Sequence, residues 1–192
     1  MRDKLIQSSI ELFEKQGFAE TSIQDIVSGL GVTKGAFYYH FPSKEALLLQ
    51  IHQRFIDALL RRQHSILESA KTCSEKLREV VLMLLQNIEQ NGASARVFFR
   101  ELQNIKEENL PGVLEKRDSF RKGISDLIRA GMKSGEFRGD LHPDMTALGI
   151  LGMCNWSYMW FNPGGLLQTE ELAVYFTGLI LSGIVREEQG WQ

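Results

Sequence analysis

The chain has 192 residues, of which 43% are hydrophobic and 24% are charged, and its formal net charge at pH 7 is −2. That length suits one domain or a small domain joined to a larger one, and the composition is ordinary for a water-soluble protein. No apolar run approaches the roughly 20 residues of a membrane span, the N-terminus carries acidic residues unlike a signal peptide, and the two cysteines, Cys73 and Cys154, are too few for a disulfide framework. We therefore expect a cytoplasmic protein with reduced cysteines and no membrane partner.

The first two helices are predicted from apolar residues that recur at helical spacing. One covers residues 3–16 and ends before Gly17. The next carries Ile26, Val27 and Leu30 on one face, and Thr21 with Gln24 is expected to form a capping box at its start. Gly31 ends this helix, since glycine takes the left-handed conformation at no side-chain cost.

A very short third helix is predicted over residues 34–40, followed by a long one that Ser43 caps. Thr33 caps the short helix, and Pro42 excludes the residue before it from the helical region. A helix, a turn containing glycine and a short helix form the helix-turn-helix pattern, whose second helix enters the major groove of DNA. We expect base contacts from Thr33, Lys34 and Tyr39, and phosphate contacts from Tyr38, His40, Lys44 and the backbone near Gly35.

The charge of this segment does not by itself predict DNA binding, because the first fifty residues hold more acidic than basic residues. Any positive surface is therefore local, and Arg2, Lys4, Lys34 and Lys44 are the candidates. We expect few phosphate contacts per subunit, so that affinity depends on dimerisation and falls with salt.

The remaining chain predicts six further helices and no linker. They follow residues 44–70, 74–91, 94–105, 113–133, 143–161 and 170–186. The helix over residues 143–161 is apolar nearly all round, which predicts burial on most sides. The expected fold is all-α with about nine helices: a helix-turn-helix DNA-binding domain, residues 1–46, on a helical ligand-binding and dimerisation domain, residues 47–192.

The run VTKGAFYYHFPSKEALL resembles the DNA-binding domain of the TetR family of bacterial transcriptional repressors, over about residues 5–49. The resemblance implies a homodimer that binds a palindromic operator on double-stranded DNA and carries a variable ligand-binding body. It also implies that the last two helices of both subunits pack as a four-helix bundle.

The runs RVFFREL and GMCNWSYMWFNPGG, together with Arg117, are similar to a TetR subgroup whose effectors are coenzyme A thioesters. That likeness implies apolar residues around an acyl chain and cations at the phosphates. The implied ligand-binding residues are Phe98, Phe99, Arg100, Leu102, Arg117, Phe120, Arg121, Met153, Asn155, Trp156, Met159 and Trp160. Asn155 lies in an otherwise apolar helix, where a buried amide needs a partner in the ligand or in a second subunit.

Other interpretations stay open. The aromatic residues also suit a plain core or dimer interface, and Glu101 among them suits a multidrug-efflux regulator that binds cationic or aromatic compounds. A helical ligand-binding protein without DNA binding is a further alternative. The four histidines show no metal-ligand spacing, and no catalytic motif is present, so we expect no enzymatic activity, no cofactor and no metal site.

Overall fold

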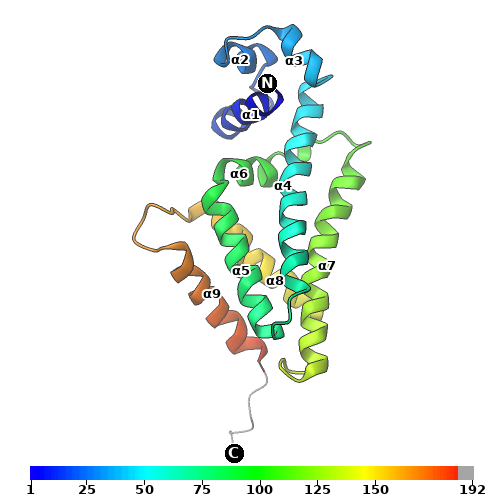
Figure 1. Ribbon diagram of the computed structural model, residues 1–192, viewed down its shortest axis with the longest axis vertical. Helices are drawn as coiled ribbons and strands as arrows, with labels where there is room; N and C mark the ends of the chain where they lie inside the picture. Colours follow the sequence, from blue (N-terminus) through cyan, green and yellow to red (C-terminus); the bar gives the residue numbers. More distant parts are fainter. Residues whose placement is uncertain (186–192) are drawn as a thin grey trace, which may run out of the picture. The chain divides into compact units, whose positions relative to one another are not determined.

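The computed structural model describes residues 1–185, and it is helical throughout apart from turns and one isolated antiparallel bridge between Phe137 and Val185. The helices of these residues, labelled in Figure 1, are α1 (Arg2–Gln16), α2 (Ile23–Gly29), α3 (Lys34–His40), α4 (Lys44–Leu67), α5 (Cys73–Gln90), α6 (Gly92–Arg100), α7 (Leu110–Ser134), α8 (Pro143–Trp160) and α9 (Thr169–Ile184). A 3₁₀ turn, η1 (Leu102–Asn104), follows α6. The described residues thus confirm the all-α fold with about nine helices. The predicted end of the last helix at Arg186 lies outside them.

The start of α2 differs from the prediction. Ser22 is the N-cap, and it forms a capping box with Asp25: Asp25 N donates to Ser22 Oγ at 3.1 Å, and Ser22 N donates to Asp25 Oδ2 at 2.8 Å. Thr21 is instead buried, and its hydroxyl donates to the Gly17 carbonyl oxygen at 2.8 Å. The expected Thr21–Gln24 pair was wrong by one residue, because Thr21 belongs to the preceding turn. Gly31 has φ +64°, as the predicted left-handed helix end requires.

The chain divides into two compact units. The first comprises residues 1–57 and 91–115, and the second comprises residues 58–90 and the described residues from 116 onward. The expected domain boundary at residue 46 stays a prediction. The first unit contains the helix-turn-helix segment together with α6 and η1.

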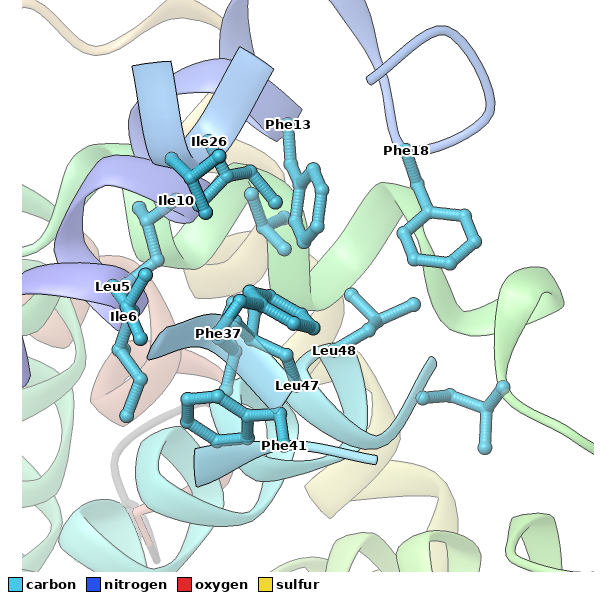
Figure 2. Packing of buried hydrophobic residues seen from close by; sticks show 14 of the residues in the cluster. Leu5, Ile6, Ile10, Phe13, Phe18, Ile26, Phe37, Phe41, Leu47 and Leu48 are labelled. Atoms are coloured by element: carbon cyan, nitrogen blue, oxygen red, sulfur yellow. The ribbon is translucent and has the colours of Figure 1, made fainter. Parts of the chain in front are cut away.

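The first unit has one hydrophobic core, which Figure 2 shows from close by. Phe37, Phe41 and Leu47 lie in it beside the apolar side chains of α1 and α2. Val97 and Ile105, from the second segment of the unit, belong to the same cluster. Burying such side chains contributes about 1.5–3 kcal/mol each, so residues 91–115 stabilise the helix-turn-helix segment directly.

The second unit is built on α5, which packs against both α8 and α9. Two glycines of α7 admit large neighbours: a Cβ at Gly131 would lie 2.2 Å from the Phe137 ring, and a Cβ at Gly123 would lie 2.7 Å from Gln63 Oε1. Gln63 Nε2 in turn donates to the Phe120 carbonyl oxygen at 2.8 Å inside the unit. Among the described residues, no helix is both long and apolar enough to cross a membrane.

The expectation that α8 is buried on most sides was wrong for the single chain. Its buried residues, Ala147, Ile150, Cys154 and Ser157, recur every three or four positions and so form one face. The side chains of Trp156 and Trp160 are 61% and 50% exposed. The single chain therefore covers only one face of this apolar helix.

Candidate functional site

Helix α3 is anchored by one residue and presents most of its others to solvent. Phe37 is fully buried, and its ring lies 5.8 Å from that of Phe41, which is buried as well. Thr33 caps the helix by accepting from Ala36 N at 3.3 Å. In a seven-residue helix one buried side chain is enough to fix which face points outward.

The residues expected to contact DNA lie mostly on this outward face. Thr33, Lys34, Gly35, Tyr38 and Tyr39 are exposed, and Tyr39 reaches 84%. His40 is half-buried, and its ring packs edge-on against Tyr39 with centroids 4.9 Å apart. Exposed hydroxyl-bearing rings beside a lysine are suited to base edges and phosphate oxygens.

Gly35 leaves the first turn of α3 open. A Cβ there would find Thr33 Oγ1 at 3.6 Å as its nearest neighbour. No acidic residue lies in the first turn of this helix. The turn therefore presents backbone amides that a phosphate can approach.

Two of the candidate cations already have partners within the unit. Arg2 Nη2 donates to Gln50 Oε1 at 2.7 Å, and its guanidinium lies 5.3 Å from the Phe41 ring. Lys44 Nζ donates to the carbonyl oxygens of Phe18 and Thr21 at 2.7 Å each. Lys44 is thus engaged inside the unit, whereas Lys34 is exposed at the start of α3.

The residues expected to bind an effector fall in both units. In the first, Phe98 is buried and stacks on Phe55 with ring centroids 4.4 Å apart. The ring of Phe99 packs edge-on against that of Phe98, with centroids 5.2 Å apart. Leu102 is half-buried, whereas Arg100 is exposed. The two phenylalanines therefore belong to an aromatic cluster between α4 and α6.

The cations of α7 differ in environment. Arg117 is half-buried, and desolvation lowers its pKa to about 10. Arg121 donates to Asp118 at 2.7 Å and to Asp144 at 2.6 Å, and these hydrogen bonds raise its pKa. Arg121 is therefore held by carboxylates of the same chain, and the lowered pKa of Arg117 reflects its partial dehydration.

The α8 residues are less buried than an enclosed pocket would require. Met153 and Asn155 are half-buried, whereas Trp156, Met159 and Trp160 are 46% exposed or more. Phe120 on α7 is buried. The acid expected for a cationic effector, Glu101, already accepts from Asn104 Nδ2 at 2.6 Å and from Phe18 N at 3.4 Å.

No group of three or more histidine, cysteine or acidic side chains is placed to hold a metal ion within residues 1–185. Desolvation raises the pKa of the buried Cys154 thiol to about 12, so it stays protonated at neutral pH.

Comparison with known proteins shows which family has this sequence and fold. The family model described as bacterial regulatory proteins, tetR family, matches residues 5–51, and the model described as the tetracyclin repressor-like C-terminal domain matches residues 70–184. The HTH-type transcriptional repressor KstR2 of Mycolicibacterium smegmatis is 29% identical over 188 residues, covering 97% of this chain and 92% of the relative.

Solved structures agree with the family models. The ketosteroid transcriptional regulator KstR2 of Mycobacterium tuberculosis is 27% identical, with a TM-score of 0.89 over 97% of this chain and 95% of that one. AibR, solved with isovaleryl coenzyme A and operator DNA, has a TM-score of 0.84 over 93% and 96% of the two chains, and at 22% identity it shows a shared fold. With an exposed α3 on a helix-turn-helix and family models over most of its length, the chain belongs to the TetR family of bacterial regulatory proteins, which are transcription regulators and not enzymes.

Proposed function

We propose that this protein is a cytoplasmic transcriptional repressor that binds a palindromic operator as a homodimer and is released by an acyl-coenzyme A thioester. The observation that carries the DNA-binding half is the outward face of α3, where Tyr39 is 84% exposed whereas Phe37 is buried. An exposed ring that carries a hydroxyl group is able to contact a base edge or a phosphate oxygen.

The roles of the residues in the DNA-binding domain are assigned from their exposure and their side-chain chemistry. Thr33, Lys34 and Tyr39 contact base edges, and Tyr38, His40 and the backbone at Gly35 contact phosphates. Lys44 contributes by holding the loop that precedes α2, because its ammonium already binds carbonyl oxygens there.

The homodimer is supported by the apolar surface of the last two helices. Exposed side chains of α8 and α9 include Trp156, Met159, Trp160, Val174, Tyr175 and Leu179. Aromatic residues and methionine are enriched in protein interfaces, and a symmetric dimer buries the same patch on both subunits. Two α3 helices then address half-sites spaced about one DNA turn, roughly 34–36 Å, or a multiple of it.

The effector class is supported by the side chains of this chain and by the names of two similar structures. AibR is named as a complex with isovaleryl coenzyme A, and KstR2 is named as a ketosteroid regulator. In this chain, Arg117 is a partly desolvated cation suited to an anionic group, and Phe99, Leu102, Phe120, Met153 and Met159 offer apolar contacts. Arg100, Arg121, Asn155, Trp156, Trp160 and Phe98 complete the proposed set.

Release follows from differential binding. Some conformations of the dimer hold the two DNA-binding domains too far apart for the operator. An effector that binds the ligand-binding domains more tightly in those conformations shifts the population away from the DNA-bound state. Coupling free energies of about 1–3 kcal/mol are usual for such links, which corresponds to about 5–150-fold in operator affinity.

A multidrug-type regulator is less favoured, since Glu101 has partners of its own.

The test is a binding titration on the DNA upstream of the protein's own gene, with and without long-chain acyl-coenzyme A. Salt-sensitive binding that the thioester weakens by about 5-fold or more supports both halves. Binding that ignores thioesters of every chain length discards the effector class and retains the repressor. If neither this DNA nor any sequence selected from random DNA is bound, the protein is not a DNA-binding regulator.

Tyr39→Ala separates the DNA contact from the fold. Loss of a base contact is worth about 1–3 kcal/mol per subunit, so operator affinity should fall at least about 10-fold. Since Tyr39 is 84% exposed, thermal unfolding and the sedimentation of the dimer should match the wild type. Unchanged operator affinity would remove α3 from the interface.

A further inference from the structure

The loop between α1 and α2, residues 17–21, is held from two sides. From α4, Lys44 Nζ donates to the carbonyl oxygens of Phe18 and Thr21 at 2.7 Å each and lies 3.4 Å from that of Ala19. The same ammonium lies 4.2 Å from the centre of the Phe18 ring. From the end of α6, Glu101 Oε1 accepts from Phe18 N at 3.4 Å.

This hold uses all the donors that Lys44 has. A lysine ammonium carries three N–H donors and no acceptor, and three carbonyl oxygens lie within 3.4 Å of it. A phosphate contact would require Lys44 to give up at least one of these carbonyls. The free protein therefore uses this cation to fix a turn.

Helix α6 also packs against α1, whose last turn directly precedes the loop. Arg96 Nε on α6 donates to Glu14 Oε1 in the last turn of α1 at 2.7 Å. Val97 and Ile105 lie in the same hydrophobic cluster as Phe18. Glu101 is itself oriented by Asn104, whose Nδ2 donates to its second oxygen at 2.6 Å.

We propose that Lys44 and Glu101 are positioning residues for operator binding, which act by fixing the α1–α2 loop and through it the start of α2. The loop ends at Thr21, and the next residue, Ser22, caps α2. Helix α2 packs against α3, so a displaced loop moves the support of the DNA-facing helix. Neither side chain contacts DNA. This inference rests on the proposed operator binding.

Salt dependence distinguishes a positioning lysine from a phosphate-binding one. Each phosphate contact contributes about −0.9 to the slope of log K against log salt on duplex DNA. We expect Lys44→Met, which keeps an apolar stem over Phe18, to lower operator affinity about 5-fold or more without changing that slope. Lys34→Met is the matched control: an exposed cation in the proposed interface displaces counterions from the DNA even where it contacts a base edge, so its removal should flatten the slope by up to about 1.8 per dimer. An equal flattening by Lys44→Met would overturn the proposal.

For Glu101, a positioning role and a purely electrostatic effect predict changes in operator affinity of opposite sign. Removing an acidic charge from a DNA-binding protein raises its affinity through the general electrostatic field. The exposed Glu107 on the same segment should follow that rule as Glu107→Ala, whereas Glu101→Ala should weaken binding about 5-fold or more. Glu101→Gln keeps an acceptor oxygen and should restore most of the affinity. If Glu101→Ala instead binds more tightly, as Glu107→Ala does, Glu101 has no positioning role.

A measurement without DNA separates this inference from the proposed function. Amide hydrogen exchange of residues 17–25 should accelerate in full-length Lys44→Met and Glu101→Ala, and stay at the wild-type rate in Lys34→Met and Glu107→Ala. Unchanged exchange in the first pair would refute the hold on the loop, even if the protein binds its operator. Faster exchange in a protein that binds no operator would retain the hold and discard the regulator.

Discussion

At the scale of the residue, the absence of a side chain at Gly131 decides whether the Phe137 ring can pack against α7. Gly131 lies in α7, where the fully buried ring of Phe137 occupies the space that a side chain would take. Nothing in the sequence around Gly131 indicates this, because Phe137 returns to the helix only after the turn at Gly135, whose φ is +81°.

We expect Gly131→Ala to lower the free energy of unfolding by about 1–3 kcal/mol, because its Cβ would lie 2.2 Å from Phe137 Cδ2 and the ring must move. Gly112→Ala in the first turn of the same helix meets nothing within 4 Å and should be neutral or stabilising by up to about 1 kcal/mol. Urea unfolding at one fixed protein concentration measures both. Equal midpoints for the two variants would contradict the packing account.

The residues on α3 illustrate what local sequence can and cannot predict. The donors and rings of the short helix are readable from its composition, and their exposure agrees with the expected surface. Lys44 is different, because its carbonyl partners lie 23 to 26 residues earlier in the chain. The phosphate contact expected of Lys44 stays a prediction, whereas its contacts with the loop could not be predicted from the local sequence.

At the scale of the element, most helix boundaries were predictable and caps less so; the helix expected over residues 94–105 ends at Arg100 and is followed by η1. The helix-turn-helix, its glycine turn and the long helix after Ser43 form where periodicity places them, and Ser43 Oγ accepts from Ala46 N at 3.1 Å. The cap of α2 was missed by one residue, because serine and threonine stand side by side there. Helix α8 was misjudged because a helix without a polar face does not indicate which side a single subunit covers.

The capping box of α2 gives an element-scale prediction. Ser22→Ala removes the acceptor of the Asp25 amide and should lower the free energy of unfolding by about 0.5–2 kcal/mol. Gln24→Ala removes only an exposed side-chain contact to Ser28, 2.9 Å long, and should change stability by less than about 0.5 kcal/mol. Thermal unfolding of the two variants decides between Ser22 and the pair predicted from the sequence. A larger loss in Gln24→Ala would restore that pair.

At the scale of the whole molecule, the family was readable from about forty residues, whereas the composition of the compact units was not. The helix-turn-helix motif is local, so its sequence signature is strong. The membership of residues 91–115 in the first unit depends on Val97 and Ile105 meeting side chains more than forty residues earlier, and single-sequence periodicity carries no information about such pairs.

The proposed homodimer is tested by placing a charge on the apolar surface of α9. Leu179 is 52% exposed in the single chain. If a second copy covers it, Leu179→Glu buries an unpaired carboxylate on each subunit and should raise the dimer dissociation constant more than about 100-fold. Leu114→Glu on α7, where Leu114 is 45% exposed, is the matched control and should remain dimeric. Sedimentation velocity reports both, and a stable Leu179→Glu dimer would exclude this surface.

The interleaved first unit also has a consequence for synthesis on the ribosome. Residues 1–57 leave the ribosome well before residues 91–115, yet both segments share one hydrophobic core. At about 5–20 residues per second the second segment follows roughly 3–12 s later. During that interval the nascent helix-turn-helix lacks part of its core, so its apolar face is open to chaperones. The hydrophobic core of the first unit can therefore form completely only after more than half of the chain has been synthesised.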